Sequence, residues 1–176
     1  MHIPDGYLSP ATCAVMYAAA APFWYRASRR VRETLSHRAV PLLALVSAFS
    51  FVIMMFNVPL PGGTTGHAVG GAIAAIVLGP WGATIAISIA LAIQALFFGD
   101  GGILAFGANA FNMAIVMPLV AWYTYRAIAS RSPLASRRRV LAGAVAGWLS
   151  LNVAALCAAV EFGLQPYLFH TADGTP

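Results

Sequence analysis

The charged residues of this chain are few, and their placement constrains the fold more than any motif does. All ten basic residues are arginines, and they fall in two short segments, residues 26–38 and 126–139. Of the 176 residues only 9% are charged and 60% are apolar, whereas about 25% of residues are charged in a typical soluble domain. This composition predicts an integral membrane protein. Arginine clusters between apolar spans mark loops on the cytoplasmic side.

The apolar segments divide into six predicted membrane spans. Their predicted bounds are residues 9–25, 39–56, 68–78, 83–98, 108–125 and 140–162. Because an even number of spans separates the two arginine segments, both lie on the cytoplasmic side and residues 1–8 lie outside. The third span, of about 11 residues, is short for a hydrocarbon layer of about 30 Å, so its outer end is expected below the membrane surface. The predicted fold is an all-α bundle that forms a single transmembrane domain over residues 1–176.

The first two residues, Met1 and His2, carry nitrogen atoms in an arrangement that binds metal ions. No basic segment precedes the following apolar run, so these residues are not expected to be removed as a secretory signal. The α-amine of Met1, the amide nitrogen of His2 and its imidazole Nδ1 can close two adjoining chelate rings in one plane. Planar nitrogen sites suit Ni²⁺ and Cu²⁺, with Co²⁺ weaker. The alternative is an ordinary polar terminus without a ligand.

A second histidine, His67, is a candidate for the fourth planar ligand. It follows residues 57–66, in which two prolines and three glycines exclude a helix and predict an external loop. The predicted topology brings His67 to the same outer face as His2. A lone histidine is otherwise more often structural, so the interpretation as a ligand depends on the chelate at the terminus.

Polar residues near these histidines are candidates for holding the ligands in place. Asp100, in the glycine-rich turn at residues 99–102, is predicted to accept a hydrogen bond from a ligand histidine, because metal-bound imidazoles nearly always donate their second nitrogen to such a group. Its alternative role is a plain turn. Asn109 is either a similar support or a contact between helices. Asp5 adds negative charge to an outer face without lysine or arginine, which concentrates divalent cations.

Four segments together resemble the CbiM/NikM family, the substrate-binding membrane subunits of energy-coupling-factor transporters for cobalt and nickel. They are residues 1–10 (MHIPDGYLSP), 61–67 (PGGTTGH), 98–102 (FGDGG) and 107–113 (GANAFNM). The resemblance covers essentially the whole chain. It implies that the Met1 amine, the amide and imidazole of His2, and His67 hold the metal. Thr65 stands where serine is also common, a change that leaves the site intact.

The resemblance also implies a cargo, partners and a location. Co²⁺ or Ni²⁺ is the expected transported substrate, captured outside by a multi-pass protein of the plasma (inner) membrane. The expected partners are a transmembrane coupling subunit, two cytoplasmic ATPases and a small accessory membrane subunit, besides the lipid bilayer; nucleic acid is not expected. Ala44 and Ala48, four residues apart, allow close helix approach and are candidates for docking such a partner.

The metal and the extent of the chain are expected from finer comparison with this family. Four planar nitrogens favour Ni²⁺, but residues 11–13 and 170–173 look closer to members associated with cobalt and cobalamin synthesis, and cobalt is preferred on that ground. Family members usually continue beyond the segment that matches residues 169–176, so one or more further spans are expected there.

Two functions from other classes stay open. The chain has no lysine and therefore cannot be a P-loop ATPase itself. A proton-coupled secondary metal transporter would need ionisable residues near the middle of the membrane, where only Glu161 comes close. A membrane metalloenzyme would hold a catalytic ion with His2 and His67 and use Asp5 or Asp100 as general base.

Overall fold

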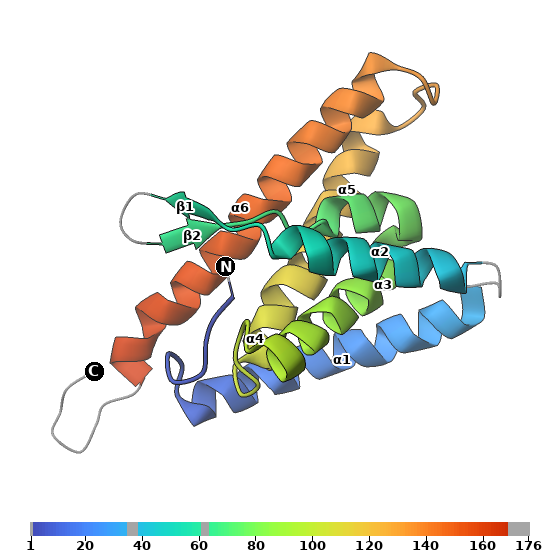
Figure 1. The fold of residues 1–176 in the computed structure, drawn as a ribbon. Coiled ribbons are helices and arrows are strands. Elements are labelled where there is room, and N and C mark those ends of the chain that lie inside the picture. Colours follow the sequence, from blue (N-terminus) through green and yellow to red (C-terminus); the bar gives the residue numbers. More distant parts are fainter. Residues whose placement is uncertain (1, 35–38, 61–63, 169–176) are drawn as a thin grey trace, which may run out of the picture.

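The computed structural model describes residues 2–34, 39–60 and 64–168, which are mostly helical as predicted (Figure 1). The elements are α1 (Pro10–Thr34), α2 (Val40–Met54), β1 (Val58–Leu60), β2 (Thr64–Gly66), α3 (Gly71–Ile93), η1 (Gln94–Phe98), α4 (Phe106–Asn109), η2 (Ala110–Val116), α5 (Met117–Ala129) and α6 (Arg137–Leu168), with η1 and η2 π-helical. Three helical segments in this part of the chain are long and apolar enough to cross a membrane, namely Gly71–Phe98, Phe106–Ala129 and Arg137–Tyr167, and α2 is a shorter apolar helix.

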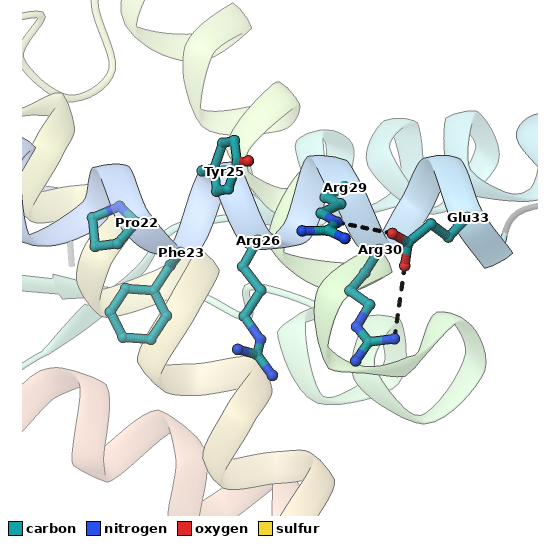
Figure 2. A pocket seen from close by; sticks show the side chains of 7 residues that line it. All are labelled: Pro22, Phe23, Tyr25, Arg26, Arg29, Arg30 and Glu33. Atoms are coloured by element: carbon teal, nitrogen blue, oxygen red, sulfur yellow. Dashed lines mark hydrogen bonds and ion pairs between the residues drawn. The ribbon is translucent and has the colours of Figure 1, made fainter.

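Helix α1 is longer than the predicted first span. It continues beyond residue 25 through four arginines and ends at Thr34. Arg29 and Arg30 both pair with Glu33 along the helix, with nitrogen–oxygen distances of 2.9 and 3.7 Å (Figure 2), and such pairs support a helix. The first arginine segment, predicted as a loop, is therefore largely helical, and its residues 35–38 lie outside the described residues.

The predicted spans 68–78 and 83–98 lie in one apolar segment that bends sharply at Gly79. This residue has φ 75° and ψ 168°, which no helix allows; glycine adopts such values at little cost, and Pro80 after it lacks the N–H that would continue the helix. The bend lies beside Arg30 at the arginine end of α1. Both flanks of the segment, at His67 and Asp100, instead contact His2. The segment Gly71–Phe98 therefore begins and ends at the His2 end of the bundle, with its bend at the arginine end.

The predicted external loop contains a short antiparallel hairpin, which departs from the all-α prediction. Strands β1 and β2 pair in a register that places Val58 opposite Gly66 and Leu60 opposite Thr64. Prolines and glycines exclude a helix here, but an extended edge strand tolerates proline. The connecting residues 61–63 lie outside the described residues.

Helix α3 lies at the centre of the bundle and packs against α1, α2, α5 and α6. Its contact surface is made of small side chains, such as Ala83, Ala86 and Ala90, which are fully buried. Small residues let helices approach closely. A separate apolar cluster, formed by Ile3, Leu8, Cys13, Ala105 and Ala108, anchors the first residues of the chain to α1 and α4.

Candidate metal-binding site

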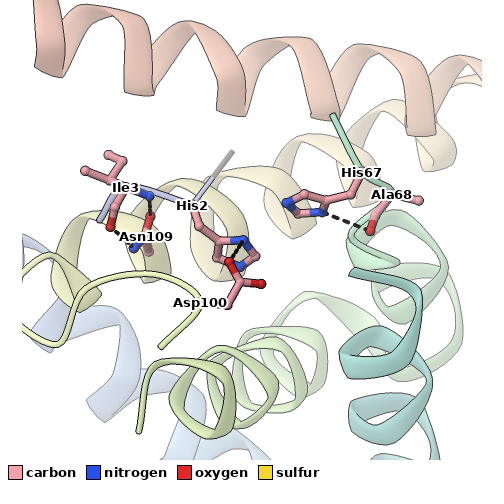
Figure 3. Close-up of polar contacts among 6 residues, drawn as sticks. All are labelled: His2, Ile3, His67, Ala68, Asp100 and Asn109. Atoms are coloured by element: carbon pink, nitrogen blue, oxygen red, sulfur yellow. Dashed lines mark hydrogen bonds and ion pairs between the residues drawn. The ribbon is translucent and has the colours of Figure 1, made fainter. Parts of the chain in front are cut away.

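Residues 2–8, called here the N-terminal segment, are fixed to α4 by Asn109. The Ile3 N–H donates to Asn109 Oδ1 at 2.8 Å, and Asn109 Nδ2 donates to the Ile3 carbonyl oxygen at 3.0 Å (Figure 3). The same carbonyl accepts the Gly102 N–H at 2.9 Å. Ile3 is 1% exposed and Asn109 is 3% exposed, so breaking these bonds would leave buried polar groups unpaired. Asn109 therefore joins the N-terminal segment to α4, and its predicted role beside the metal stays a prediction.

Asp5 fixes the N-terminal segment to the loop at residues 99–105. Its carboxylate accepts the backbone N–H groups of Ile103 and Ala105, each at 3.0 Å. The two backbones approach so closely that a Cβ at Gly102 would lie 2.5 Å from the Asp5 amide nitrogen. The glycine-rich turn is required for this approach. The sequence offered Asp5 as a support near the histidines, as a source of negative charge and as a possible general base, but its backbone partners about 100 positions away could not be read from the sequence.

The rings of His2 and His67 lie face to face (Figure 3); His67 is buried, and the His2 side chain is 7% exposed. Their ring centroids are 4.8 Å apart and their planes differ by 16°. His67 Nδ1 lies 3.2 Å from the Ala68 carbonyl oxygen, and His2 Nδ1 lies 3.3 Å from Asp100 Oδ1. A neutral imidazole faces an oxygen through its N–H, which leaves the lone pair of each ring on Nε2. Both Nε2 atoms are buried and make no hydrogen bond with any residue of the described part of the chain.

Burial lowers the pKa of both imidazoles. It lowers the pKa of His2 from 6.5 to about 4; the nearby Asp100 carboxylate opposes this shift, and His67 adds to it. The pKa of His67 is lowered as well, chiefly by burial. Both rings are therefore neutral at pH 7, which is the form of histidine that binds a metal. Two neutral, buried and unpaired imidazole nitrogens side by side are a suitable donor set for a divalent transition metal.

Asp100 lies beside His2 and faces the nitrogen that the predicted chelate would use, so its predicted role as an acceptor for a metal-bound histidine stays a prediction. The predicted chelate uses Nδ1 of His2, and this atom faces the Asp100 carboxylate in the structure. A half turn of the ring about its Cβ–Cγ bond exchanges Nδ1 with Cδ2 and Cε1 with Nε2. Such a turn would place Nε2 on the Asp100 side and free Nδ1 for the chelate.

The remaining predicted residues lie around or outside this arrangement. Met1 lies outside the described residues. Thr65 lies in β2, two positions before His67, and its side chain is outside the described part. Ala44 and Ala48 are exposed on α2.

Gln94, at the start of η1, is a polar residue of the site that the sequence analysis did not identify. It is 1% exposed. Its amide lies beside the His2 ring and favours the protonated form of His2, although neither amide atom meets hydrogen-bond geometry with a described residue. The sequence did carry a signal for it, a glutamine inside an apolar run. Burying an unpaired amide is costly, so a glutamine at such a position indicates a polar contact.

Fold and site together define a helical membrane protein with a buried imidazole pair at one end of its bundle. The family model described as "Cobalt uptake substrate-specific transmembrane region" matches residues 2–174. The chain therefore belongs to the CbiM family, as its motifs indicated.

Relatives and solved structures agree with this membership. The chain is 60% identical to the fused nickel transport protein NikMN of Rhodobacter capsulatus, over 100% of this chain and 51% of that protein. It is 49% identical to the probable fused nickel transport protein LarMN of Lactiplantibacillus plantarum, over 100% of this chain and 53% of that protein. The chain thus spans about half the length of these relatives. A crystal structure described as a truncated transition metal transporter matches with a TM-score of 0.92 at 55% identity, over 100% of this chain and 80% of that one.

Proposed function

We propose that this chain captures a divalent transition metal, nickel or cobalt, as the substrate-binding subunit of an ATP-driven energy-coupling-factor uptake transporter. The observation that carries the proposal is the pair of buried Nε2 atoms on His2 and His67, which face no hydrogen-bond partner among the described residues, in a chain of the cobalt uptake family. With the His2 ring turned so that its Nδ1 faces the metal, the α-amine of Met1, the amide nitrogen and Nδ1 of His2, and Nε2 of His67 would form a plane of four nitrogens. Thr65 is a proposed support of the loop that carries His67.

Nickel is the proposed first substrate. A plane of four nitrogens favours Ni²⁺ over Co²⁺, and the two fused relatives at 60% and 49% identity are named for nickel. The preference for cobalt, which rested on residues 11–13 and 170–173, is not retained for that reason. Cobalt stays the second candidate, and with it a contribution to cobalamin synthesis.

The proposed topology has six crossings, with the arginine segments inside and the N-terminal segment outside the plasma membrane. The bend at Gly79 supports this number, because it divides the apolar segment Gly71–Phe98 into two arms. Its first arm, residues 71–78, is only about 12 Å long at about 1.5 Å per residue. His67 would therefore lie below the outer surface of a hydrocarbon layer of about 30 Å.

Energy for transport would come from partners, a coupling subunit and two ATPases, with a small accessory membrane subunit as a further candidate. Helix α2 is the proposed docking surface. Ala44 and Ala48 are exposed on it, and Leu45 and Val52 beside them are 66% and 51% exposed. Small residues among exposed apolar ones suit close packing with another membrane helix.

The two alternative functions gain little support from the same contacts. Glu161 accepts a hydrogen bond from Asn112 Nδ2 at 3.0 Å, which ties α6 to η2 and suits a structural role better than proton transport. A metalloenzyme would need a free general base. The carboxylate of Asp5 is already engaged by two backbone N–H groups.

Metal uptake by the assembled transporter, compared between two tagged forms at equal membrane expression, tests the proposal. An N-terminal tag converts the Met1 amine into an amide and should abolish uptake, whereas a C-terminal tag should be tolerated. His67→Ala should retain weak Ni²⁺ binding and lose the planar absorption spectrum. Equal uptake by the two tagged forms would exclude the terminal amine as a ligand and overturn the proposed site.

A further inference from the structure

A cavity of about 220 Å³ lies beside the imidazole pair, between the ends of α2 and η1. The residues that line it are Phe51, Met55, Asn57, Gln94, Phe98 and Asp100. Its rim is accessible, since Asn57 and Phe98 are exposed and the Asp100 side chain is 38% exposed. Asp100 belongs both to the cavity and to the site, because its Oδ1 lies 3.3 Å from His2 Nδ1.

Gln94 forms the buried part of this cavity, and its side-chain amide lies beside the His2 ring without completing a hydrogen bond among the described residues. It is 1% exposed, and its Oε1 and Nε2 find no hydrogen-bond partner among the described residues. Its backbone is fully used, since its carbonyl oxygen accepts the N–H groups of Gly99 and Asp100. Folded proteins seldom leave buried amides unpaired without a reason such as a bound polar ligand.

We propose that this cavity is a waiting site for a hydrated divalent cation, which is held there before it passes to the nitrogen ligands. This inference rests on the proposed function. Asn57, Gln94 and Asp100 offer oxygen atoms, which hard or hydrated cations prefer, and the Asp100 carboxylate supplies the complementary charge. Six waters at about 30 Å³ each occupy about 180 Å³, which the cavity accommodates. The contact between Asp100 and His2 then gives the ion a short route to the imidazoles.

A waiting site and a ligand-positioning role have different kinetic consequences. A residue of the waiting site that keeps its contact with the ion during transfer lowers the barrier in both directions, so its loss slows association and dissociation by the same factor and Kd stays the same. A residue that holds His2 in place changes the stability of the bound state, and its loss acts mainly on the dissociation rate and on Kd.

The experiment compares the wild-type protein, Gln94→Met and the matched control Gln165→Met, each with a natural N-terminus. Gln165 is a second glutamine with a buried amide nitrogen lacking a partner among the described residues, and its Oε1 accepts the Thr12 hydroxyl at 3.1 Å. It lies in α6 and does not line the cavity. Stopped-flow loading with Ni²⁺, followed through a chromophoric chelator, gives the association rate, and a chelator chase gives the dissociation rate. In Gln94→Met both rates should fall by about tenfold, because the variant loses one hydrogen bond to a charged partner. Kd should stay unchanged. Gln165→Met should match the wild type.

Magnesium chloride provides a second measurement. Oxygen ligands accept Mg²⁺, whereas nitrogen ligands favour the transition metal. Millimolar Mg²⁺ should therefore slow Ni²⁺ loading of the wild type without displacing bound Ni²⁺, and this slowing should be lost in Gln94→Met. The variant should fold, because it removes an unpaired buried amide.

Each remaining outcome is decisive. Loading of Gln94→Met at the wild-type rate, with unchanged sensitivity to Mg²⁺, overturns the waiting site. A higher Kd caused by faster release alone also overturns it and makes Gln94 a positioning residue for His2. A wild-type protein that binds no Ni²⁺ at all refutes the proposed function itself.

Discussion

The two ends of this bundle are held together in different ways. At the site end, hydrogen bonds join residues 98 to 106 positions apart, such as the buried bonds between Asn109 and Ile3 and the exposed bond from Ile103 to Asp5. At the arginine end, Arg29 and Glu33 pair one helical turn apart, with side chains 69% and 44% exposed. The first kind of contact fixes where one part of the chain lies against another, and the second supports a single helix.

The energetic difference follows from exposure. An exposed pair of this kind contributes about 0.3–0.5 kcal/mol, because water and salt screen it. A buried hydrogen bond contributes about 1 kcal/mol, and a stranded partner costs about 1–3 kcal/mol. The site end should therefore respond sharply to single substitutions, and the arginine end should tolerate them.

The largest effect is expected from Asn109→Leu. Leucine is close to asparagine in volume, but it makes neither of the two hydrogen bonds to Ile3. We expect the free energy of docking of the N-terminal segment to fall by about 3 kcal/mol. This loss corresponds to about 100-fold weaker Ni²⁺ binding. Hydrogen exchange at the Ile3 amide and calorimetric titration measure the two effects. An Ile3 amide that stays protected in the variant would show that the apolar cluster around Ile3 holds the segment without Asn109.

Gly102→Ala should have the next largest effect. The new Cβ would lie 2.5 Å from the Asp5 amide nitrogen, so the loop or the N-terminal segment must move, and Ni²⁺ affinity should fall by about 10- to 100-fold. Gly163→Ala is the matched control, because no atom of the described residues outside its own helix lies within 4 Å of its added Cβ. That change should be neutral or slightly stabilising. Equal affinities in the two variants would contradict the close approach of the two backbones.

An intermediate effect is expected from pH in the metal-free protein. The pKa of His2 is about 4 when the segment is docked and 6.5 when it is released, so the released form binds more protons between these values. Docking should be complete above about pH 6.5 and weaken as the pH falls toward 4, by about 2 kcal/mol at pH 5. Exchange at the Ile3 amide between pH 7 and 5 tests this, and His2→Gln should remove the dependence. Titration of His2 near 6.5 in the docked protein would contradict its burial as a neutral ring.

The smallest effect is expected at the arginine end. Glu33→Gln removes one ion-pair partner from Arg29 and one from Arg30, and thermal stability should change by no more than about 0.5 kcal/mol, with Ni²⁺ affinity unchanged. A loss of about 3 kcal/mol, as expected for Asn109→Leu, would show that the arginine end is as sensitive to single substitutions as the site end.

Much of this protein could be predicted from the sequence because hydropathy and charge act locally. The scarcity of charge indicates a membrane protein, and glycine and proline at residues 79 and 80 place a break in the apolar run regardless of its surroundings. The motifs around His2 and His67 indicate the family, which the comparison confirmed over residues 2–174. They also name two residues that the fold brings face to face.

Tertiary structure alone decided how the site is supported. Nothing local distinguishes an Asp5 that accepts two backbone N–H groups from one that only carries charge, or an Asn109 that holds a terminus from one that joins helices. Gln94 is polar by sequence, but only the packing of η1 leaves its amide without a partner beside His2 among the described residues. The physical reason is that hydrogen bonds depend on distances of a few tenths of an ångström between segments about 100 residues apart, and those distances exist only once the whole bundle has packed.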